Sequence, residues 1–330
     1  MAVLVTGGAG YIGSHMVLAL LDAGEEVVVL DRLSTGFRWA VADEARFYQG
    51  DIADAVLLDQ IASENAIDAI VHFAGSIVVP ESVARPLDYY ENNTVKTRAL
   101  LDFAVRAGIP HFVFSSTAAV YGTPETMEPV SETSRLSPES PYGSSKLMSE
   151  IMLRDAAAAH GLTYTVLRYF NVAGADPKGR TGQSFLGATH LIKVACQAVL
   201  GQRPGISVFG TDYPTPDGTC IRDYIHVSDL VAAHLKALER MRAGGKSLVA
   251  NCGYGRGFSV LDVLSNMKTV SGTDFRIDYE PRRAGDPSIV VANPALAKQE
   301  LGWVPEHDDL PHILASALSW EKYLIGKNSY

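Results

Sequence analysis

The sequence has only three cysteines among its 330 residues, Cys196, Cys220 and Cys252. Their odd number and wide spacing exclude a disulfide framework and do not match the ligand spacing of a zinc site. We therefore expect three buried, unpaired thiols in a reducing compartment, and no bound metal.

Long apolar runs are also lacking, because none reaches the roughly 18 residues that a membrane-spanning helix needs. The N-terminus passes directly into an apolar strand pattern, without the basic segment and cleavage site of a secretory signal. We therefore expect a cytoplasmic protein without a membrane partner.

Basic residues are fewer than acidic ones, since the sequence has 28 Lys and Arg but 37 Asp and Glu, and the net charge is −9. This balance, without a long run of like charge, excludes nucleic acid as the main partner but allows a small anion held by a few arginines. Internal repeats and low-complexity segments are absent. The length and the 47% hydrophobic content predict one large domain or two closely joined domains.

The first thirty residues follow the pattern of a dinucleotide-binding unit. An apolar strand pattern at Ala2–Thr6 leads into a glycine turn, a helical pattern to about Ala23 and a second strand at Glu26–Leu30. The glycines allow the backbone to approach a pyrophosphate at the helix N-terminus, where free N–H groups and the helix dipole favour an anion. The candidate residues in this turn are Gly7, Gly10, Tyr11, Ile12 and Gly13.

An acidic residue, Asp31, ends the second strand. A carboxylate here accepts hydrogen bonds from the adenosine ribose and repels a 2′-phosphate, so NAD is favoured over NADP. Arg32 weakens this preference, because an arginine at this place can pair with such a phosphate.

Strand and helix patterns alternate through the first half of the chain. Alternation of this kind predicts an α/β fold with a Rossmann-like, doubly wound parallel sheet, whose ligand lies at the carboxyl ends of the strands. Four residues at such ends are candidate cofactor walls: Asp51, Ile52, Phe73 and Ala74. His72, directly before Phe73, is expected to be a hydrogen-bonded strand residue, not a base.

The second half is less regular and predicts a smaller C-terminal substrate domain. We expect an NAD-binding domain at residues 1–175 and a nucleotide-sugar-binding domain at 176–330, with a segment near 225–250 that returns to the first. A helix is expected at His226–Arg240 with Ser228 as its N-cap, and Ser259 with Asp262 predicts a capping box at another helix start.

A tyrosine and a lysine stand four residues apart in Ser140–Lys146, one turn along one helix face. An ammonium about 4 Å from the Tyr142 phenol, together with a second cation, would bring the pKa of that phenol from about 10 to near 7. Thr117 ends a predicted strand at the same edge of the sheet. We expect Thr117, Tyr142 and Lys146 to form a catalytic group.

These stretches are joined by further motifs, and together they resemble the extended short-chain dehydrogenase/reductase family and, within it, the UDP-hexose 4-epimerases. The motifs run over nearly the whole chain: VTGGAGYIGSH (5–15), FSSTAAVYG (114–122), SPYGSSKLM (140–148), LRYFNVAGA (167–175), FGTDYPTPDGTCIRDYIHV (209–227) and PRRAGD (281–286). The resemblance implies interconversion of UDP-glucose and UDP-galactose by transient hydride transfer to bound NAD through a 4-keto sugar.

The same resemblance implies roles for individual residues. Tyr142 is the acid/base, Lys146 is its electrostatic partner and a cofactor ligand, and Thr117 contacts the sugar. Asn92 and Tyr169 lie near the cofactor. The residues implied for the UDP-sugar are Asn171, Ser207 and Phe209 (the uracil wall), Arg222 and Arg283 (a pyrophosphate clamp), and Asp286. A homodimer through the helices Tyr89–Ala107 and Tyr142–His160 is also implied.

Three positions depart from the family pattern. Ile77 replaces a lysine that contacts the cofactor in some epimerases, and His190 replaces an asparagine on the nucleotide sugar. Val290 replaces a bulky tyrosine, so we expect a roomier sugar pocket that accepts N-acetylated hexoses.

Three alternatives remain. Ala118-Ala119 follow Thr117 where a 4,6-dehydratase carries an Asp-Glu pair, which argues against dehydration. Uronate or pentose substrates stay open. A non-enzymatic NAD-sensing protein would be free to lose Tyr142 or Lys146, and this chain has both.

Overall fold

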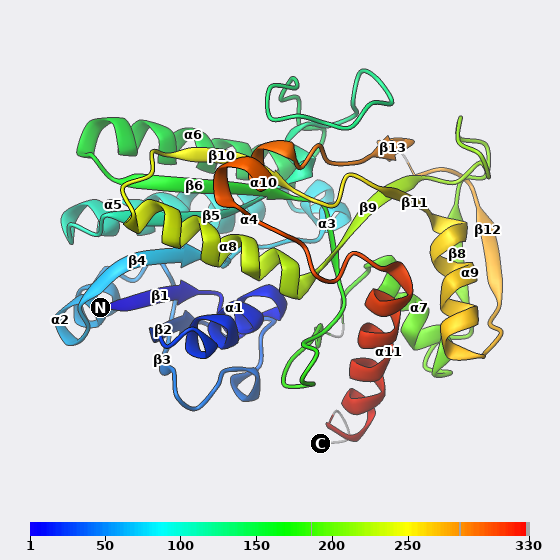
Figure 1. Cartoon of the computed structure of the whole chain (residues 1–330), viewed down its shortest axis with the longest axis horizontal. Coiled ribbons are helices and arrows are strands. Elements are labelled where there is room, and N and C mark those ends of the chain that lie inside the picture. Colours follow the sequence, from blue (N-terminus) through cyan, green and yellow to red (C-terminus); the bar gives the residue numbers. More distant parts are fainter. Residues whose placement is uncertain (186, 284, 328–330) are drawn as a thin grey trace.

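The fold is organised around a parallel sheet of seven strands in the order β10-β6-β5-β4-β1-β2-β3 (Figure 1). The structure is a computed structural model and describes residues 1–185, 187–283 and 285–327. Ala284 of the PRRAGD motif therefore lies outside the described residues. The strands of this sheet are β1 (Ala2–Thr6), β2 (Glu26–Asp31), β3 (Arg46–Gln49), β4 (Ile67–His72), β5 (His111–Thr117), β6 (Thr163–Tyr169) and β10 (Leu248–Cys252).

Alternating side chains of the strands fill two apolar layers. In β1, Val3 and Val5 join one buried cluster, whereas Leu4 joins the other. A strand that is buried on both faces must be apolar at every position, as the Ala-Val-Leu-Val run of β1 is. Helices therefore cover both faces of the sheet, and the fold class predicted from the sequence is confirmed.

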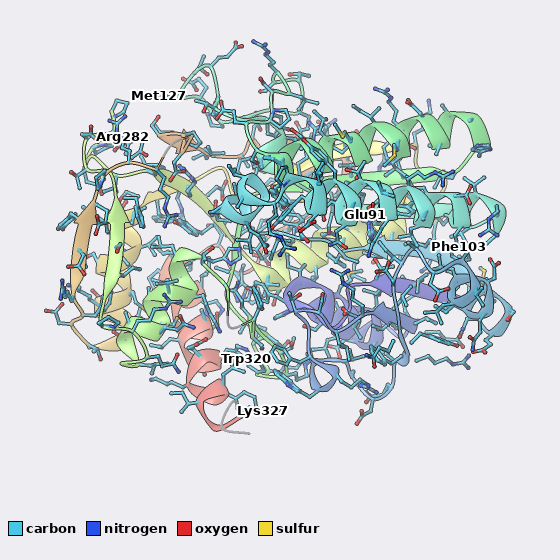
Figure 2. All side chains as sticks on the ribbon, turned by 180° about the vertical axis from the view of Figure 1, so that it is seen from behind. Glu91, Phe103, Met127, Arg282, Trp320 and Lys327 are labelled. Atoms are coloured by element: carbon cyan, nitrogen blue, oxygen red, sulfur yellow. The ribbon has the colours of Figure 1, made fainter. Side chains whose placement is uncertain are left out.

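Helices α1, α8 and α10 cover one face of the sheet, and α5 and α6 cover the opposite face (Figure 1). Figure 2 shows the molecule from the opposite side, with Phe103 of α5 labelled. The helices of these layers are α1 (Tyr11–Asp22), α2 (Ala55–Glu64), α3 (Val79–Ala84), α4 (Pro86–Tyr89), the π-helix η2 (Tyr90–Val95), α5 (Lys96–Arg106), α6 (Pro141–His160), α8 (Val227–Arg242) and α10 (Ala295–Leu301). The helix expected at Tyr89–Ala107 is thus interrupted by a π-helical turn.

A smaller lobe lies beyond the carboxyl ends of the strands, at the right of Figure 1. Its apolar cluster is continuous with that under α1 and α8. The lobe contains α7 (Leu191–Val199), α9 (Val260–Ser271), α11 (Leu310–Lys327), and the strands β7 (Asn171–Ala173), β8 (Ile206–Phe209), β9 (Ile221–His226), β11 (Gly257–Ser259), β12 (Ile277–Glu280) and β13 (Ile289–Val290). Short 3-10 turns are η1 (Arg38–Ala40) and η3 (Ala118–Val120).

The second half of the chain returns to the main sheet. Helix α8 packs on β5 and β6, and β10 then pairs in parallel with β6. The domain boundary at residue 175 stays a prediction, and we propose that the first domain is discontinuous and includes α8 and β10.

Local details of the second half test three expectations. The three thiols are free and buried, as predicted. The capping box of Ser259 and Asp262 is confirmed. The N-cap predicted at Ser228 is wrong, because α8 begins at Val227 and the imidazole of His226 accepts the hydrogen bond from the Ser228 N–H.

Among the described residues, no helix is long and apolar enough to cross a bilayer.

Four buried histidines make the stability of this fold depend on pH. Burial lowers the pKa of His15 and His234 to about 4, and that of His72 and His226 to about 3, from the usual 6.5. His72, as expected, is bonded on both ring nitrogens, to Thr6 and Thr97.

Because unfolding frees these rings to bind protons, the unfolded state takes up more protons below pH 6.5, and stability falls as pH falls toward 4. Each histidine contributes at most about 1.4 kcal/mol per pH unit to this loss. Urea titrations from pH 8 to 5 should show the decline. His234→Gln should make it shallower and His160→Gln, at an exposed position, should not. A flat profile over this range would contradict the prediction.

Candidate functional site

A single cleft of about 1690 Å³ lies between the carboxyl ends of the main strands and the smaller lobe. The candidate residues from the sequence line it, with one exception. Those in the lining are Gly7, Gly10, Tyr11, Ile12, Gly13, Asp31, Asp51, Ile52, Phe73, Ala74, Asn92, Thr117, Tyr142, Tyr169, Asn171, Ser207, Phe209, Arg222, Arg283 and Asp286. The exception is Lys146, which is buried behind the cleft surface.

The glycine turn forms a close-fitting cradle at one end of the cleft. Gly7 has φ +74°, and a Cβ there would lie 2.6 Å from the Ala74 nitrogen. A Cβ on Gly13 would lie 2.1 Å from the Gly7 carbonyl oxygen. Helix α1 begins directly after Gly10, with no side-chain cap on its first N–H groups. The cradle therefore offers backbone donors to an anion and excludes any side chain between them.

The carboxylate of Asp31 is fixed beside this cradle. Its two oxygens accept hydrogen bonds from Ala9 N (3.0 Å) and Leu33 N (2.7 Å). A carboxylate has about four acceptor positions, so capacity remains for a pair of ribose hydroxyls.

Two basic residues, Arg32 beside Asp31 and Lys96 of α5, are paired with another acid of the cleft. Lys96 and Arg32 lie 2.5 Å and 3.6 Å from Asp51. The Arg32 charge is thus partly neutralised by Asp51. Lys96 was not singled out from the sequence, since its partner lies 45 residues away.

Helix α6 brings Tyr142 into the middle of the cleft. Ser140 caps the helix by accepting from Gly143 N at 3.2 Å, which fixes the first turn and the buried Tyr142 in it. Burial raises the pKa of the Tyr142 phenol, and a hydrogen bond with Thr117 opposes that rise because it favours the phenolate.

The lysine of this helix is directed at the backbone of β5. Lys146 Nζ donates to the Ser115 carbonyl oxygen (3.0 Å) and lies over the Phe114 ring. Burial lowers the pKa of Lys146 to about 8, and Glu150 opposes that fall. Burial therefore raises the pKa of Tyr142 in the protein alone. The pKa near 7 expected from the sequence requires a second cation, such as an oxidised nicotinamide, and stays a prediction.

A buried polar network supports α6 from below. Glu150, one turn after Lys146, pairs with Arg168 of β6 (2.6 Å) and accepts from Ser116. Arg168 also donates to Tyr121 Oη (3.1 Å). This network was not found from the sequence. The four-residue spacing of Tyr142, Lys146 and Glu150, which places three polar side chains on one helix face, could have indicated it.

The opposite end of the cleft carries two arginines from the smaller lobe. Arg222 of β9 pairs with Asp286, and the Arg283 guanidinium lies 3.7 Å from the centre of the Phe209 ring. The neighbouring Arg282 does not line the cleft, since it pairs with Asp212 at the outer edge of the lobe (Figure 2). This end of the cleft combines cationic groups with an aromatic face, which suits an anionic nucleotide.

The three positions that depart from the family pattern also line the cleft. Val290 is 8% exposed in the wall, and Ile77 is exposed at 46%. His190 faces the cleft with Gln183, whose amide lies 2.8 Å from His190 Nδ1, and burial lowers the pKa of this histidine. Gln183 was not found from the sequence, because no local pattern marks it.

Comparison with known proteins gives a consistent result. A model of the NAD dependent epimerase/dehydratase family matches residues 3–253. UDP-glucose 4-epimerase of Azospirillum brasilense is 59% identical over 322 residues, which are 98% of this chain and 92% of that protein. The structure of the UDP-Glc/GlcNAc 4-epimerase from Campylobacter jejuni superposes with a TM-score of 0.86 at 47% identity, covering 98% and 99% of the two chains. That of UDP-glucose 4-epimerase from Bifidobacterium longum, in complex with NAD⁺ and UDP, has a TM-score of 0.93 at 35% identity and covers both chains fully, at 100%.

Proposed function

Because the chain belongs to the NAD-dependent epimerase/dehydratase family, we propose that it interconverts UDP-glucose and UDP-galactose by reversible epimerisation at C4. The proposal rests on one main observation. A continuous cleft joins the glycine cradle and Asp31 at one end to Arg222 and Arg283 at the other, with Tyr142 between them. A dinucleotide and a nucleotide sugar therefore fit with their reactive ends toward Tyr142.

NAD is the cofactor, and the residues of the first end fit it. The backbone of the glycine turn holds the pyrophosphate, Asp31 accepts from the adenosine ribose, and Phe73 and Ala74 form part of the wall. Asn92, Tyr169 and Lys146 hold the nicotinamide end. When bound, NAD would supply a hydride acceptor for C4 of the sugar and a hydride donor for the other face of the resulting keto group.

Tyr142 acts as both base and acid within one cycle. Its phenolate takes the proton of the C4 hydroxyl as the 4-keto sugar forms, and its phenol returns that proton when the sugar is reduced. Thr117, hydrogen-bonded to the phenol, stabilises the phenolate and contacts the sugar oxygen. Lys146, with a pKa of about 8, carries a positive charge at pH 7 that favours the same ionisation. A positioned acid/base contributes about 10²–10⁴ to the rate.

The phosphates are bound strongly and the hexose weakly. Arg222 and Arg283 clamp the diphosphate, whose oxygens match the guanidinium fork. Ser207 and Phe209 contact the uracil, and Asn171 and Asp286 complete the nucleotide site. This distribution keeps the keto sugar tethered while its ring turns over to present the other face.

A 4,6-dehydratase is disfavoured by the residues that follow Thr117. Ala118 and Ala119 line the cleft beside it, and methyl groups cannot transfer the protons that elimination of water requires. Reversible epimerisation needs no such pair.

The proposal is tested by incubating the purified protein, without added NAD, with UDP-galactose and following product by NMR. We expect conversion to UDP-glucose without net NADH. Tyr142→Phe should lower the rate by about 10²–10⁴ because the acid/base is lost, with the protein still folded and loaded with NAD. Tyr323→Phe, the same change at an exposed tyrosine, should leave the rate unaltered. Net accumulation of NADH would identify a dehydrogenase instead.

We further propose that N-acetylated UDP-hexoses are substrates. The small Val290 side chain forms part of the cleft wall, and the relative from Campylobacter jejuni is named as an epimerase of UDP-Glc and GlcNAc.

UDP-N-acetylglucosamine should therefore be turned over, and Val290→Tyr should abolish that activity by filling the space. The same variant should retain activity on UDP-galactose, measured in parallel. Absence of turnover by the unaltered protein would disprove the roomier pocket.

We also propose a homodimer through the segment Tyr89–Ala107, which comprises η2 and α5, and the segment Tyr142–His160 of α6. Apolar side chains are exposed on these segments, among them Val95 (51%), Met148 (44%) and Ile151 (40%). Helix α6 packs against η2, so these side chains lie on neighbouring elements. Exposed apolar side chains that form a patch are typical of a protein contact.

Light scattering should give a dimeric mass, and Val95→Glu should convert it to a monomeric one by placing a charge in the interface. Val304→Glu, at an exposed valine outside these helices, is the matched control. A monomeric mass for the unaltered chain would refute the dimer.

A further inference from the structure

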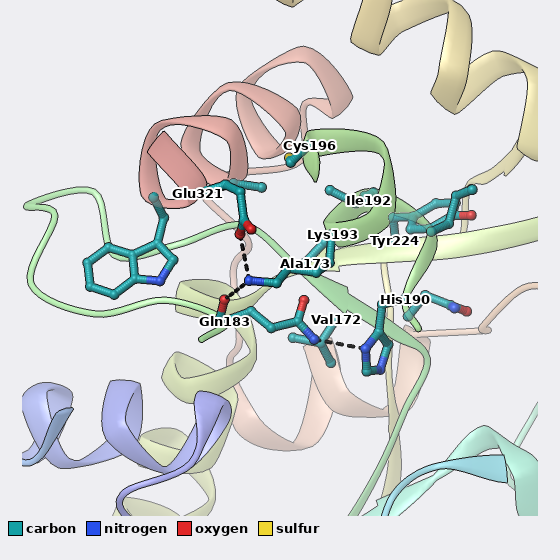
Figure 3. Close-up of a pocket in the computed structure, with 14 residues that line it drawn as sticks. Val172, Ala173, Gln183, His190, Ile192, Lys193, Cys196, Tyr224 and Glu321 are labelled. Atoms are coloured by element: carbon teal, nitrogen blue, oxygen red, sulfur yellow. Dashed lines mark hydrogen bonds and ion pairs between the residues drawn. The ribbon is translucent and has the colours of Figure 1, made fainter. Parts of the chain in front are cut away.

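A buried ion pair joins the C-terminal helix to the smaller lobe, and it takes no part in the proposed chemistry. Lys193 of α7 lies 2.5 Å from Glu321 of α11, and their side chains are only 2% and 5% exposed. Figure 3 shows the lysine between the Glu321 carboxylate and the backbone of Gln183.

The same lysine holds the wall of the cleft. Lys193 Nζ donates to the Gln183 carbonyl oxygen (2.8 Å), and the Gln183 side chain bonds to His190 (2.8 Å; Figure 3). The residue beside Glu321, Trp320, donates from its indole to Ser184 Oγ (3.2 Å). Helix α11 is thus bonded to a segment of which Gln183, Ser184 and His190 line the cleft.

The wall that this pair supports belongs to the nucleotide end of the cleft. A small cavity of about 20 Å³ beside Lys193 is lined by Asn171, His190, Leu191 and Tyr224, all of which also line the main cleft. Tyr142 and Thr117 do not line that cavity. The ion pair therefore supports the part of the cleft wall proposed for the phosphates, and not the part that contains the acid/base Tyr142.

Stability alone does not account for an ion pair in this position. Desolvation of two buried charges offsets most of their attraction, and apolar residues of similar size commonly stabilise a core as well or better. An apolar side chain, however, cannot bind a carbonyl oxygen. Lys193 fixes the orientation of the Gln183 carbonyl group, and Glu321 balances the positive charge of Lys193.

We propose that Lys193 and Glu321 are positioning residues for the UDP-sugar: they hold the Gln183–His190 contact against the nucleotide and so set its affinity, without affecting the rate of the chemical step. This inference rests on the proposed function, since it assumes that a UDP-sugar occupies this end of the cleft.

The test is the double variant Lys193→Met/Glu321→Leu, which removes both charges and leaves neither unpaired in the core. UDP affinity is measured by calorimetry on the NAD-loaded protein, and KM and kcat are measured with UDP-galactose. We expect the Kd for UDP and the KM to rise about tenfold, the factor that one hydrogen bond controls. The kcat should stay within about twofold, because only binding of the substrate is altered.

Three further variants separate positioning from folding. Lys193→Arg retains the charge and the donors and should restore most of the affinity. Arg240→Met/Glu300→Leu removes the ion pair between α8 and α10, which does not line the cleft, and should leave KM unchanged. If the double variant does not fold, Glu321→Asp keeps both charges, shortens the side chain by one methylene and should raise KM in the same direction.

Wild-type Kd and KM in a folded variant, even one with a lower melting temperature, would overturn the inference. A wild-type protein that binds no UDP would overturn the proposed function itself, and the inference with it.

Discussion

The hydrogen bond from Lys146 Nζ to the Ser115 carbonyl fixes helix α6 against strand β5, and the site depends on this contact. It sets the position along the strand at which Tyr142, one turn earlier, meets Thr117 at the strand end. One turn later, Glu150 meets Arg168 of the next strand. A shift of α6 by one residue would turn this whole face away from the sheet, because the helical repeat rotates each residue by about 100°.

Burial at this contact has opposite effects on the two groups proposed for the proton chemistry. It raises the pKa of Tyr142 and lowers that of Lys146 to about 8, so the phenol is protonated at pH 7 while the lysine keeps most of its charge. In a site of low dielectric, any added positive charge near the phenol has a large effect on its ionisation. In the proposed mechanism, Tyr142 therefore stays protonated until the cleft holds the groups that favour a phenolate.

The local parts of the fold could be predicted from the sequence, because they depend on neighbouring residues. The glycine turn after β1, the strand end at Asp31 and the N-cap at Ser140 all follow from spacing within a few positions. The pairs between distant segments of the chain could not be predicted this way. Arg222 and Asp286 are separated by 64 residues, and Lys193 and Glu321 by 128, so no periodicity connects them. The burial that raises the pKa of Tyr142 could not be predicted either, since spacing reveals a neighbouring charge but not the depth of burial.

The return of β10 to the main sheet links the order of synthesis to the order of folding. A chain emerging from the ribosome presents β1 to β6 first, yet the edge of β6 stays unpaired until Leu248–Cys252 has been made. An unpaired edge strand is open to pairing with other chains. The nascent protein thus exposes this edge during the synthesis of some eighty residues, from Thr163–Tyr169 to β10, and α8 precedes β10 in that interval. Late closure of the sheet therefore leaves this edge open to misassembly throughout that stretch of translation.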